Sequence, residues 1–207
     1  MGKSVCYNIQ DVEKTGKMRK KDMYEGNMDR SFLTTYYKHR FNPTKAVEEN
    51  IIIGDIAHAL SLLCRGNGHL RIFYSVAQHS IKTALEAEAR GYDSRLQLCC
   101  LLHDASEAYI GDVISPLKLQ LHRYMDYEEK LQKTIYSALE VDYPNEQEWE
   151  IVKEIDRAML YHEFKLLHGD LLFKKEPEIH VSISQEEIPH QQVETEFISL
   201  YRRLKEY

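Results

Sequence analysis

Four side chains have the types and spacing of a metal site: His79, His103, Asp104 and Asp156. Mixed nitrogen and oxygen ligation suits Mn²⁺, Co²⁺, Fe²⁺, Ni²⁺ or Zn²⁺ better than Ca²⁺, which prefers oxygen ligands alone. Four protein ligands on an ion that can take five or six leave positions open for water and a phosphate oxygen. Open positions are typical of a catalytic site. The sequence therefore predicts one divalent transition metal at a catalytic centre.

The His-Asp pair would mean little by itself, because such pairs are common on protein surfaces. Here it lies in a predicted helix over residues 94–110 that is apolar almost all round, as expected for a helix in the middle of a domain. Burying an unpaired carboxylate costs on the order of several kcal/mol. His103, Asp104 and Glu107 occupy one turn of that helix and need partners. A bound cation between them would be an efficient one.

Asp156 and His79 each have a simpler interpretation. Asp156 occupies the apolar stripe of a predicted helix over residues 146–167, where it can pair with Arg157 or Arg65 instead of a metal. His79 lies near the start of another predicted helix, where it can be an ordinary half-buried histidine. The metal hypothesis depends on all four side chains meeting at one point.

The elements that must position these side chains are predicted to be helical nearly throughout. Gly91, Gly111 and Gly169 follow predicted helices as natural stops. Asp55 is expected to cap one helix, and Ser75 with Gln78 matches a capping box at the start of another. The predicted helices cover residues 56–64, 76–90, 94–110, a short stretch after Ser115-Pro116, 126–140, 146–167 and 193–204, and the alternation at 179–183 is compatible with a short strand.

The predicted fold class is all-α, with one helical bundle. We expect a polar, loosely structured N-terminal arm over residues 1–30 and the catalytic domain over 31–170. An extension over 171–207 would pack on this domain or on a second subunit as a homodimer.

Five stretches of the chain carry a family resemblance. The order His79, then His103-Asp104, then Asp156 is similar to that of the HD-domain metal-dependent phosphohydrolase superfamily. The surrounding motifs resemble the bacterial and phage members related to the 5′-deoxynucleotidases. These motifs are DIAHALS from Asp55, CRGNGH from Cys64, YSVAQHS from Tyr74, LHDASEAYIGD from Leu102 and SPLK from Ser115.

The resemblance implies a role for each matching residue. The four ligands hold the metal, Glu107 positions or deprotonates the attacking water, and Asp112 handles protons or orients the substrate. Arg65 contacts the substrate phosphate, and Lys118 is a candidate for a second contact, although it can also be an ordinary surface lysine. Members of the group often carry an aromatic residue after the arginine, where this chain has Gly66, so Phe73 or Tyr74 would have to stack on a base.

The composition indicates the cellular compartment and argues against some classes of binding partner. The 207 residues carry 27 basic and 33 acidic side chains, a net charge of −6, which argues against binding to a nucleic-acid polymer. No apolar run approaches the roughly 20 residues of a membrane-spanning helix, so no membrane association is expected. The four cysteines form no CxxC pair, which fits a reducing cytoplasm.

The leading functional hypothesis is a phosphohydrolase of nucleotides, most simply a 5′-deoxynucleotidase acting on (deoxy)nucleoside monophosphates. A deoxynucleoside triphosphate triphosphohydrolase and an alarmone hydrolase would use the same site. A non-catalytic, metal-binding HD module is the alternative from another functional class, and a helical scaffold without metal would leave the polar turn at His103 unexplained.

Overall fold

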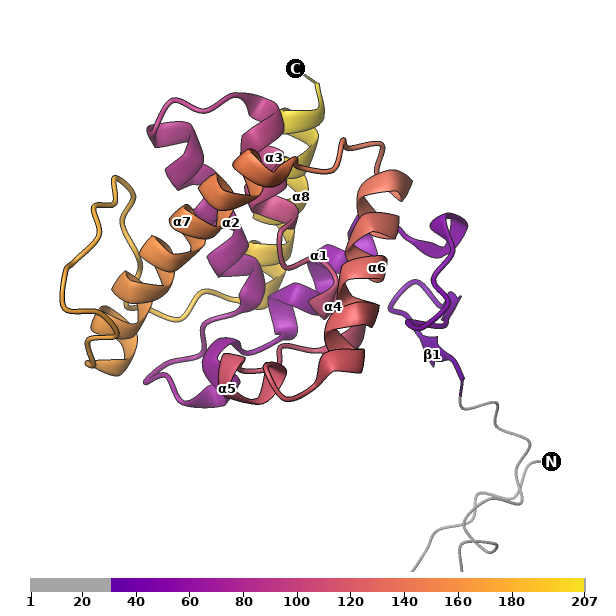
Figure 1. Cartoon of the computed structure of the whole chain (residues 1–207), viewed down its shortest axis with the longest axis horizontal. Coiled ribbons are helices and arrows are strands. Elements are labelled where there is room, and N and C mark those ends of the chain that lie inside the picture. The colour runs from indigo at the N-terminus through magenta and orange to yellow at the C-terminus, as the bar shows by residue number, and fades with distance from the viewer. Residues whose placement is uncertain (1–30, 207) are drawn as a thin grey trace, which may run out of the picture. The chain divides into compact units, whose positions relative to one another are not determined.

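Helices make up nearly all the regular structure of residues 31–206, which are the residues that the computed structural model describes. The all-α prediction is confirmed, whereas the predicted arm at 1–30 lies outside the described residues. Figure 1 shows the helices, which are α1 (Ile53–Leu62), α2 (Val76–Ala89), α3 (Ser94–Leu102), α4 (Glu107–Ile110), α5 (Ser115–Lys118), α6 (His122–Ala138), α7 (Glu146–Glu163) and α8 (His190–Lys205).

One two-stranded sheet and three helical turns, four units in all, complete the regular structure of the described residues. Strands β1 (Leu33–Thr34) and β2 (Arg40–Phe41) form a two-stranded antiparallel sheet in which Leu33 faces Phe41. The single-turn 3₁₀ helices are η2 (Glu48–Asn50) and η3 (Arg65–Gly68). The fourth is a π-helical turn, η4 (Phe164–His168), which directly continues α7.

Helix α3 lies at the centre of the core. Its residues from Leu96 to Leu102 are all buried, and it packs against α2, α7 and α8. Oδ1 of Asp93 accepts a hydrogen bond from the backbone N–H of Leu96 at 2.8 Å. This bond caps the start of the helix. The predicted apolar helix therefore occupies the position in the domain that its composition indicates.

The start of α2 agrees with its predicted capping box. Ser75 accepts a hydrogen bond from the backbone N–H of Gln78, and the Gln78 side chain accepts one from the N–H of Ser75. The helix ends at Ala89, and Gly91 follows with a φ of 82°, a left-handed conformation that favours glycine. Local signals thus fix both ends of the helix that carries His79.

The prediction of one unbroken helix over 94–110 is wrong. Helix α3 ends at Leu102, and α4 begins only at Glu107. The side chain of Gln132 on α6 holds the break: it donates to the carbonyl of Leu102 and accepts from the backbone N–H of Ser106 at 2.9 Å. A contact from another helix therefore sets where this one stops.

Two smaller expectations are also corrected. Asp55 does not cap a helix, because α1 begins at Ile53 and the carboxylate of Asp55 accepts a hydrogen bond from the N–H of Tyr37 at 2.8 Å. Residues 179–183 form no strand. The backbone N–H groups of His180 and Val181 instead bind the buried carboxylate of Glu86 on α2.

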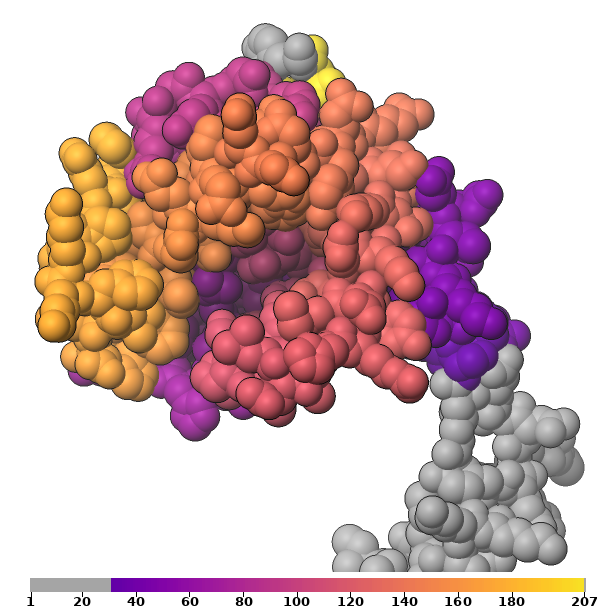
Figure 2. Space-filling view, in the orientation of Figure 1, coloured from indigo at the N-terminus to yellow at the C-terminus, as the bar shows by residue number. Residues whose placement is uncertain are grey.

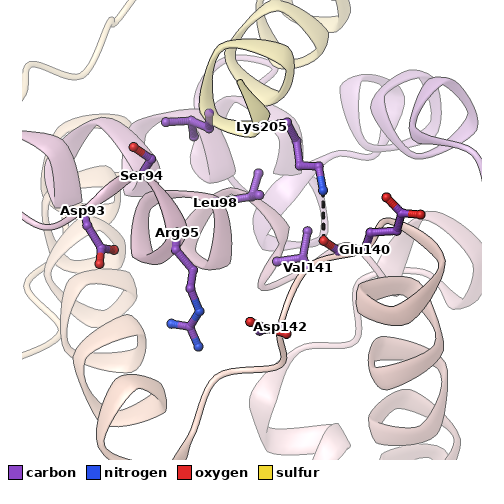
Figure 3. A pocket seen from close by; sticks show the side chains of 9 residues that line it. Asp93, Ser94, Arg95, Leu98, Glu140, Val141, Asp142 and Lys205 are labelled. Carbon is purple, nitrogen blue, oxygen red and sulfur yellow. Dashed lines mark hydrogen bonds between the residues drawn. The ribbon is translucent and has the colours of Figure 1, made fainter. Parts of the chain in front are cut away.

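Helix α8 packs against α1, α2 and α3 within the same compact unit. Lys205 near its end donates to the carbonyls of Leu139 and Glu140 after α6, as Figure 3 shows for Glu140. The surface pocket beside Lys205 also contains Arg95, which is paired with Glu148. No helix of residues 31–206 combines the length and the apolar character needed to cross a bilayer.

Candidate metal centre

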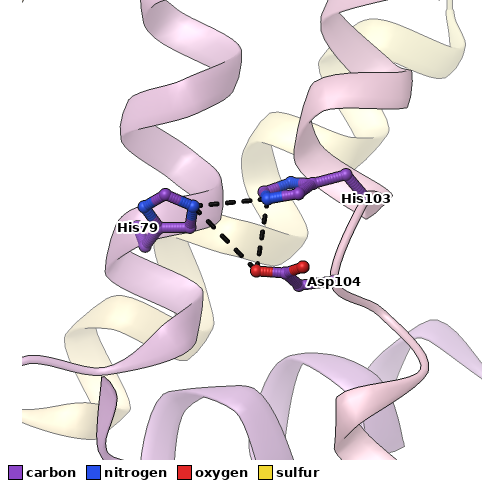
Figure 4. A group of neighbouring side chains, drawn as sticks. All are labelled: His79, His103 and Asp104. Carbon is purple, nitrogen blue, oxygen red and sulfur yellow. Dashed lines mark hydrogen bonds and ion pairs between the residues drawn. The ribbon is translucent and has the colours of Figure 1, made fainter. Parts of the chain in front are cut away.

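Three segments that are distant in sequence bring the four predicted ligands together. His79 comes from the first turn of α2, His103 and Asp104 from the break after α3, and Asp156 from α7. Figure 4 shows His79, His103 and Asp104 pointing toward one another. The imidazole of His79 is fully buried and that of His103 is 6% exposed, whereas the carboxylates of Asp104 and Asp156 are 21% and 31% exposed.

The donor atoms lie close enough to share one ion. Nε2 of His79 lies 3.3 Å from Nε2 of His103 and 3.0 Å from Oδ1 of Asp156. Oδ2 of Asp104 lies 3.2 Å from Nε2 of His103 and 3.9 Å from Nε2 of His79. Nε2 of His103 is 3.8 Å from Oδ1 of Asp156. For metal bonds of about 2.0–2.2 Å, adjacent ligands are roughly 3.0–3.5 Å apart, so the group fits an ion after small side-chain adjustments.

Hydrogen bonds fix which ring nitrogens face the centre. Nδ1 of His79 donates to Oε1 of Glu163 at 2.8 Å, and Nδ1 of His103 donates to the carbonyl of Cys100 at 2.7 Å. In the neutral imidazole each Nε2 is therefore left with a free lone pair, as a metal ligand requires. Two lone pairs and two carboxylates converge, and this donor set is suited to a cation.

The electrostatics of the centre favour positive charge. Although burial opposes a charged imidazole, Asp104 and Asp156 raise the pKa of His103 well above its usual value. Burial likewise opposes the charged form of Asp156, but hydrogen bonds with His103 and His79 hold its pKa well below the usual range. A proton or a divalent ion can supply the charge, and the donor set suits a divalent transition metal.

Arg65 lies against the same carboxylates. Its Nε donates to Oε2 of Glu163 at 2.9 Å, its Nη2 lies 3.4 Å from Oδ1 of Asp156, and its Nη1 lies 3.6 Å from Oδ2 of Asp104. The simpler interpretation of Asp156, a pairing with Arg65, is thus also seen. Both can hold together, because the guanidinium contacts Asp156 while the same carboxylate faces the imidazoles.

Glu107 is the first residue of the short helix α4, and Asp112 lies two residues after its end. Glu107 is 5% exposed, and within residues 31–206 its Oε2 has no hydrogen-bond partner. Burial first, and then the charges of Asp104 and Asp112, raise its pKa well above the usual value. Burial also raises the pKa of Asp112. A carboxyl group with a raised pKa is suited to proton transfer near neutral pH.

Lys118 is half-buried at the end of α5, and its ammonium is paired with Glu128 of α6 at 2.7 Å. The charges of Glu107 and Asp104 contribute to raising its pKa, although burial opposes this and the pairing with Glu128 is the larger favourable effect. Lys118 therefore lies within the electrostatic reach of the centre, and its contact with a phosphate stays a prediction.

Glu163 was missed from the sequence, although it contacts both His79 and Arg65. It lies seven residues after Asp156, two turns further along the same face of α7, among the buried residues Ile155 and Met159. Glu163 is a second carboxylate on the apolar face of this helix, after Asp156, and this pattern could have identified it as a candidate site residue.

Phe73 and Tyr74 are the two aromatic residues expected to stack on a base. Phe73 is half-buried, and its stacking stays a prediction. Tyr74 is 1% exposed and therefore offers no ring face to a substrate. A Cβ at Gly66 would lie 3.5 Å from Cγ of Leu70 and 3.8 Å from Cζ of Phe164. The ring beside this turn is thus that of Phe164, which comes from η4 and could not be assigned from local sequence.

Comparison with known proteins adds a family match and two relatives. The sequence profile of the HD domain matches residues 72–172. The uncharacterized protein YfdR of Escherichia coli K12 is 40% identical over 106 residues, which cover 51% of this chain and 56% of that protein. The uncharacterized protein RCAP_rcc00048 of Rhodobacter capsulatus is 38% identical over 92 residues, 42% of this chain and 47% of that protein. The chain thus spans about half the length of each of these relatives.

Proposed function

Because this chain belongs to the HD-domain superfamily of metal-dependent phosphohydrolases, we propose that it hydrolyses phosphate esters of nucleotides. The most specific form of the proposal is a 5′-deoxynucleotidase that acts on (deoxy)nucleoside monophosphates. The resident ion would be one of Mn²⁺, Co²⁺, Fe²⁺, Ni²⁺ and Zn²⁺, bound by His79, His103, Asp104 and Asp156.

One observation carries this proposal. Two imidazole nitrogens and two carboxylate oxygens from α2, α7 and the turn after α3 lie close together, and the measured separations between nitrogen and oxygen are 3.0–3.9 Å. A buried carboxyl oxygen of Glu107 is unpartnered within residues 31–206, and the guanidinium of Arg65 lies beside the carboxylates. A structural metal site would not need either of these groups.

A hollow in the surface supports access for a substrate. Figure 2 shows a hollow between α7 and the segment of α5 and α6, with earlier parts of the chain at its floor. This hollow separates the helix that carries Asp156 from the helix that carries Lys118. A small phosphoester fits this arrangement better than a polymer, in line with the net charge of −6.

Each group of the site has its own role in the proposed hydrolysis of a phosphate ester. When bound, a divalent ion lowers the pKa of a water ligand and polarises a phosphate oxygen. Arg65 offers Nη1 and Nη2 to phosphate oxygens and offsets the negative charge that grows in the transition state. Glu107 accepts a proton from the attacking water, and Asp112 is the second carboxyl group available to hold a proton.

The test is a panel of nucleoside mono-, di- and triphosphates, incubated with Mn²⁺ or Co²⁺ and analysed by product. A 5′-deoxynucleotidase releases inorganic phosphate and a nucleoside from monophosphates. Release of tripolyphosphate would instead indicate a triphosphohydrolase, and release of pyrophosphate from guanosine alarmones an alarmone hydrolase. A metal-loaded protein that hydrolyses no member of the panel would contradict the proposal and favour a non-catalytic module.

A further inference from the structure

Glu163 differs from an ordinary buried carboxylate in what its two oxygens bind. The side chain is 1% exposed at the end of α7. Oε1 accepts a hydrogen bond from Nδ1 of His79 at 2.8 Å, and Oε2 accepts one from Nε of Arg65 at 2.9 Å. One carboxylate therefore joins a predicted metal ligand to the predicted phosphate-binding residue.

Each of these two hydrogen bonds has a separate consequence. The bond to Nδ1 keeps the proton on that nitrogen, so that Nε2 of His79 faces His103 and Asp156 as a lone-pair donor. The bond to Nε fixes the plane of the guanidinium. Nη1 and Nη2 are then turned toward Asp104 and Asp156, at 3.6 and 3.4 Å, which is the side where a phosphate on the shared ion would lie.

We propose that Glu163 is a positioning residue that serves both halves of the site, by holding His79 for the metal and Arg65 for the phosphate. The inference rests on the metal-dependent phosphohydrolase proposed above. Glu163 itself does not contact the substrate. It acts through the two side chains that it holds.

The competing explanation is that Glu163 only neutralises a buried arginine. The chain contains a matched case: Glu86 on α2 is fully buried and accepts hydrogen bonds from Nε of Arg90 at 2.9 Å and from Nδ1 of His180 at 3.0 Å. Glu86 thus has the same pair of partner groups, but neither partner belongs to the candidate site. Its Oε2 also accepts from the backbone N–H groups of His180 and Val181, so its substitution controls for the loss of a buried, hydrogen-bonded carboxylate.

The experiment compares Glu163→Gln with Glu86→Gln in the full chain. Because His79 and Arg65 bind different oxygens of Glu163, the NH₂ group of glutamine would replace one of these acceptors and face a donor. Isothermal titration of the metal-free protein with Mn²⁺ measures metal affinity, and titration with inorganic phosphate at saturating Mn²⁺ measures anion affinity. We expect Glu163→Gln to bind Mn²⁺ about 10- to 100-fold more weakly and phosphate at least about tenfold more weakly.

Glu86→Gln should lower the thermal midpoint and leave both affinities unchanged. If Glu163→Gln does not fold, Glu163→Asp keeps the charge but shortens the side chain, and it should show the same two losses. Wild-type affinities in a folded Glu163 variant would overturn the proposal, and so would the loss of only one affinity. A wild-type protein that binds no Mn²⁺ would instead contradict the metal centre and the proposed function.

Discussion

At the scale of single residues, the candidate site separates ligands from the groups that act on a substrate. The donor atoms of His79, His103 and Asp104 lie within 4.8 Å of one another, and Oδ1 of Asp156 lies 3.0 Å from Nε2 of His79. Glu107 instead has an Oε2 without a hydrogen-bond partner among the described residues. Substitutions should therefore separate loss of metal from loss of turnover.

Replacing Glu107 with glutamine should reduce turnover by about 10²- to 10⁴-fold, because the amide cannot accept a proton from water. The metal content should stay at the wild-type level, since Glu107 is not a ligand. Elemental analysis and a phosphate-release assay on the same preparation measure both quantities. Glu88→Gln, at an exposed position of α2 paired with Arg203, serves as the control. Full turnover in Glu107→Gln would remove the role assigned to this carboxyl group.

Replacing Asp156 with asparagine should abolish metal retention and turnover together. The amide keeps the volume of the side chain but loses the charge that balances the ion and the guanidinium of Arg65. If Asp156 served only to pair with Arg65, the variant would keep its metal. Metal content after dialysis against metal-free buffer distinguishes the two interpretations.

His103, Asp104 and Asp156 are predicted ligands because each is a polar residue in an apolar pattern, and His79 because it lies near the start of a capped helix. Glu163 followed the same rule but was missed, because no motif drew attention to the end of α7. The place of Phe164 beside Gly66 could not be predicted. It depends on how α7 and the turn after α1 meet in three dimensions.

At the scale of elements, local signals predicted helix α2 well and failed at the end of α3. The capping box of Ser75 and Gln78 involves four consecutive residues, so sequence contains all of it. The break after Leu102 has no glycine or proline to mark it. It depends on Gln132, 30 residues further along the chain.

Replacing Gln132 with methionine keeps the side-chain volume but removes both hydrogen bonds to the break. The N–H of Ser106 would lose its partner in a buried site, which costs about 1–3 kcal/mol for an unpaired group, whereas the carbonyl of Leu102 would keep its hydrogen bond from the N–H of Ala105 at 3.0 Å. Urea denaturation should show this loss, together with weaker Mn²⁺ binding because His103 and Asp104 lie within the break. Gln97→Met is the control, since Gln97 is also buried but binds the carbonyl of Tyr92. Unchanged Mn²⁺ affinity in Gln132→Met would show that the break holds without Gln132.

At the scale of the whole molecule, buried carboxylates tie the late part of the chain to the helices. Glu86 binds the backbone of His180 and Val181 as well as Arg90, and so fastens the segment before α8 to α2. Burial opposes its charge, but hydrogen bonds with His180 and Arg90 hold its pKa below the usual value of 4.5.

This shift predicts part of the acid sensitivity of the fold. Because the folded pKa of Glu86 is lower than the unfolded one, the unfolded chain binds more protons and stability falls as the pH drops through these values. The contribution is fully present well above pH 4.5 and is lost as the pH falls below it. The stability difference between wild type and Glu86→Gln, measured by urea denaturation from pH 7 to pH 3, should therefore shrink in acid. A difference that stays constant over this range would exclude the mechanism.

The unequal exposure of the predicted ligands indicates the side from which a metal ion would enter and leave the site. The imidazoles are 0% and 6% exposed, and the carboxylates 21% and 31%. A cation that approached from solvent would meet the more exposed oxygens of Asp104 and Asp156 before the buried nitrogens, and it would leave in the reverse order. Chelators should therefore strip the ion at a rate that these two outer side chains govern, and a bound phosphate ester across them would slow its escape.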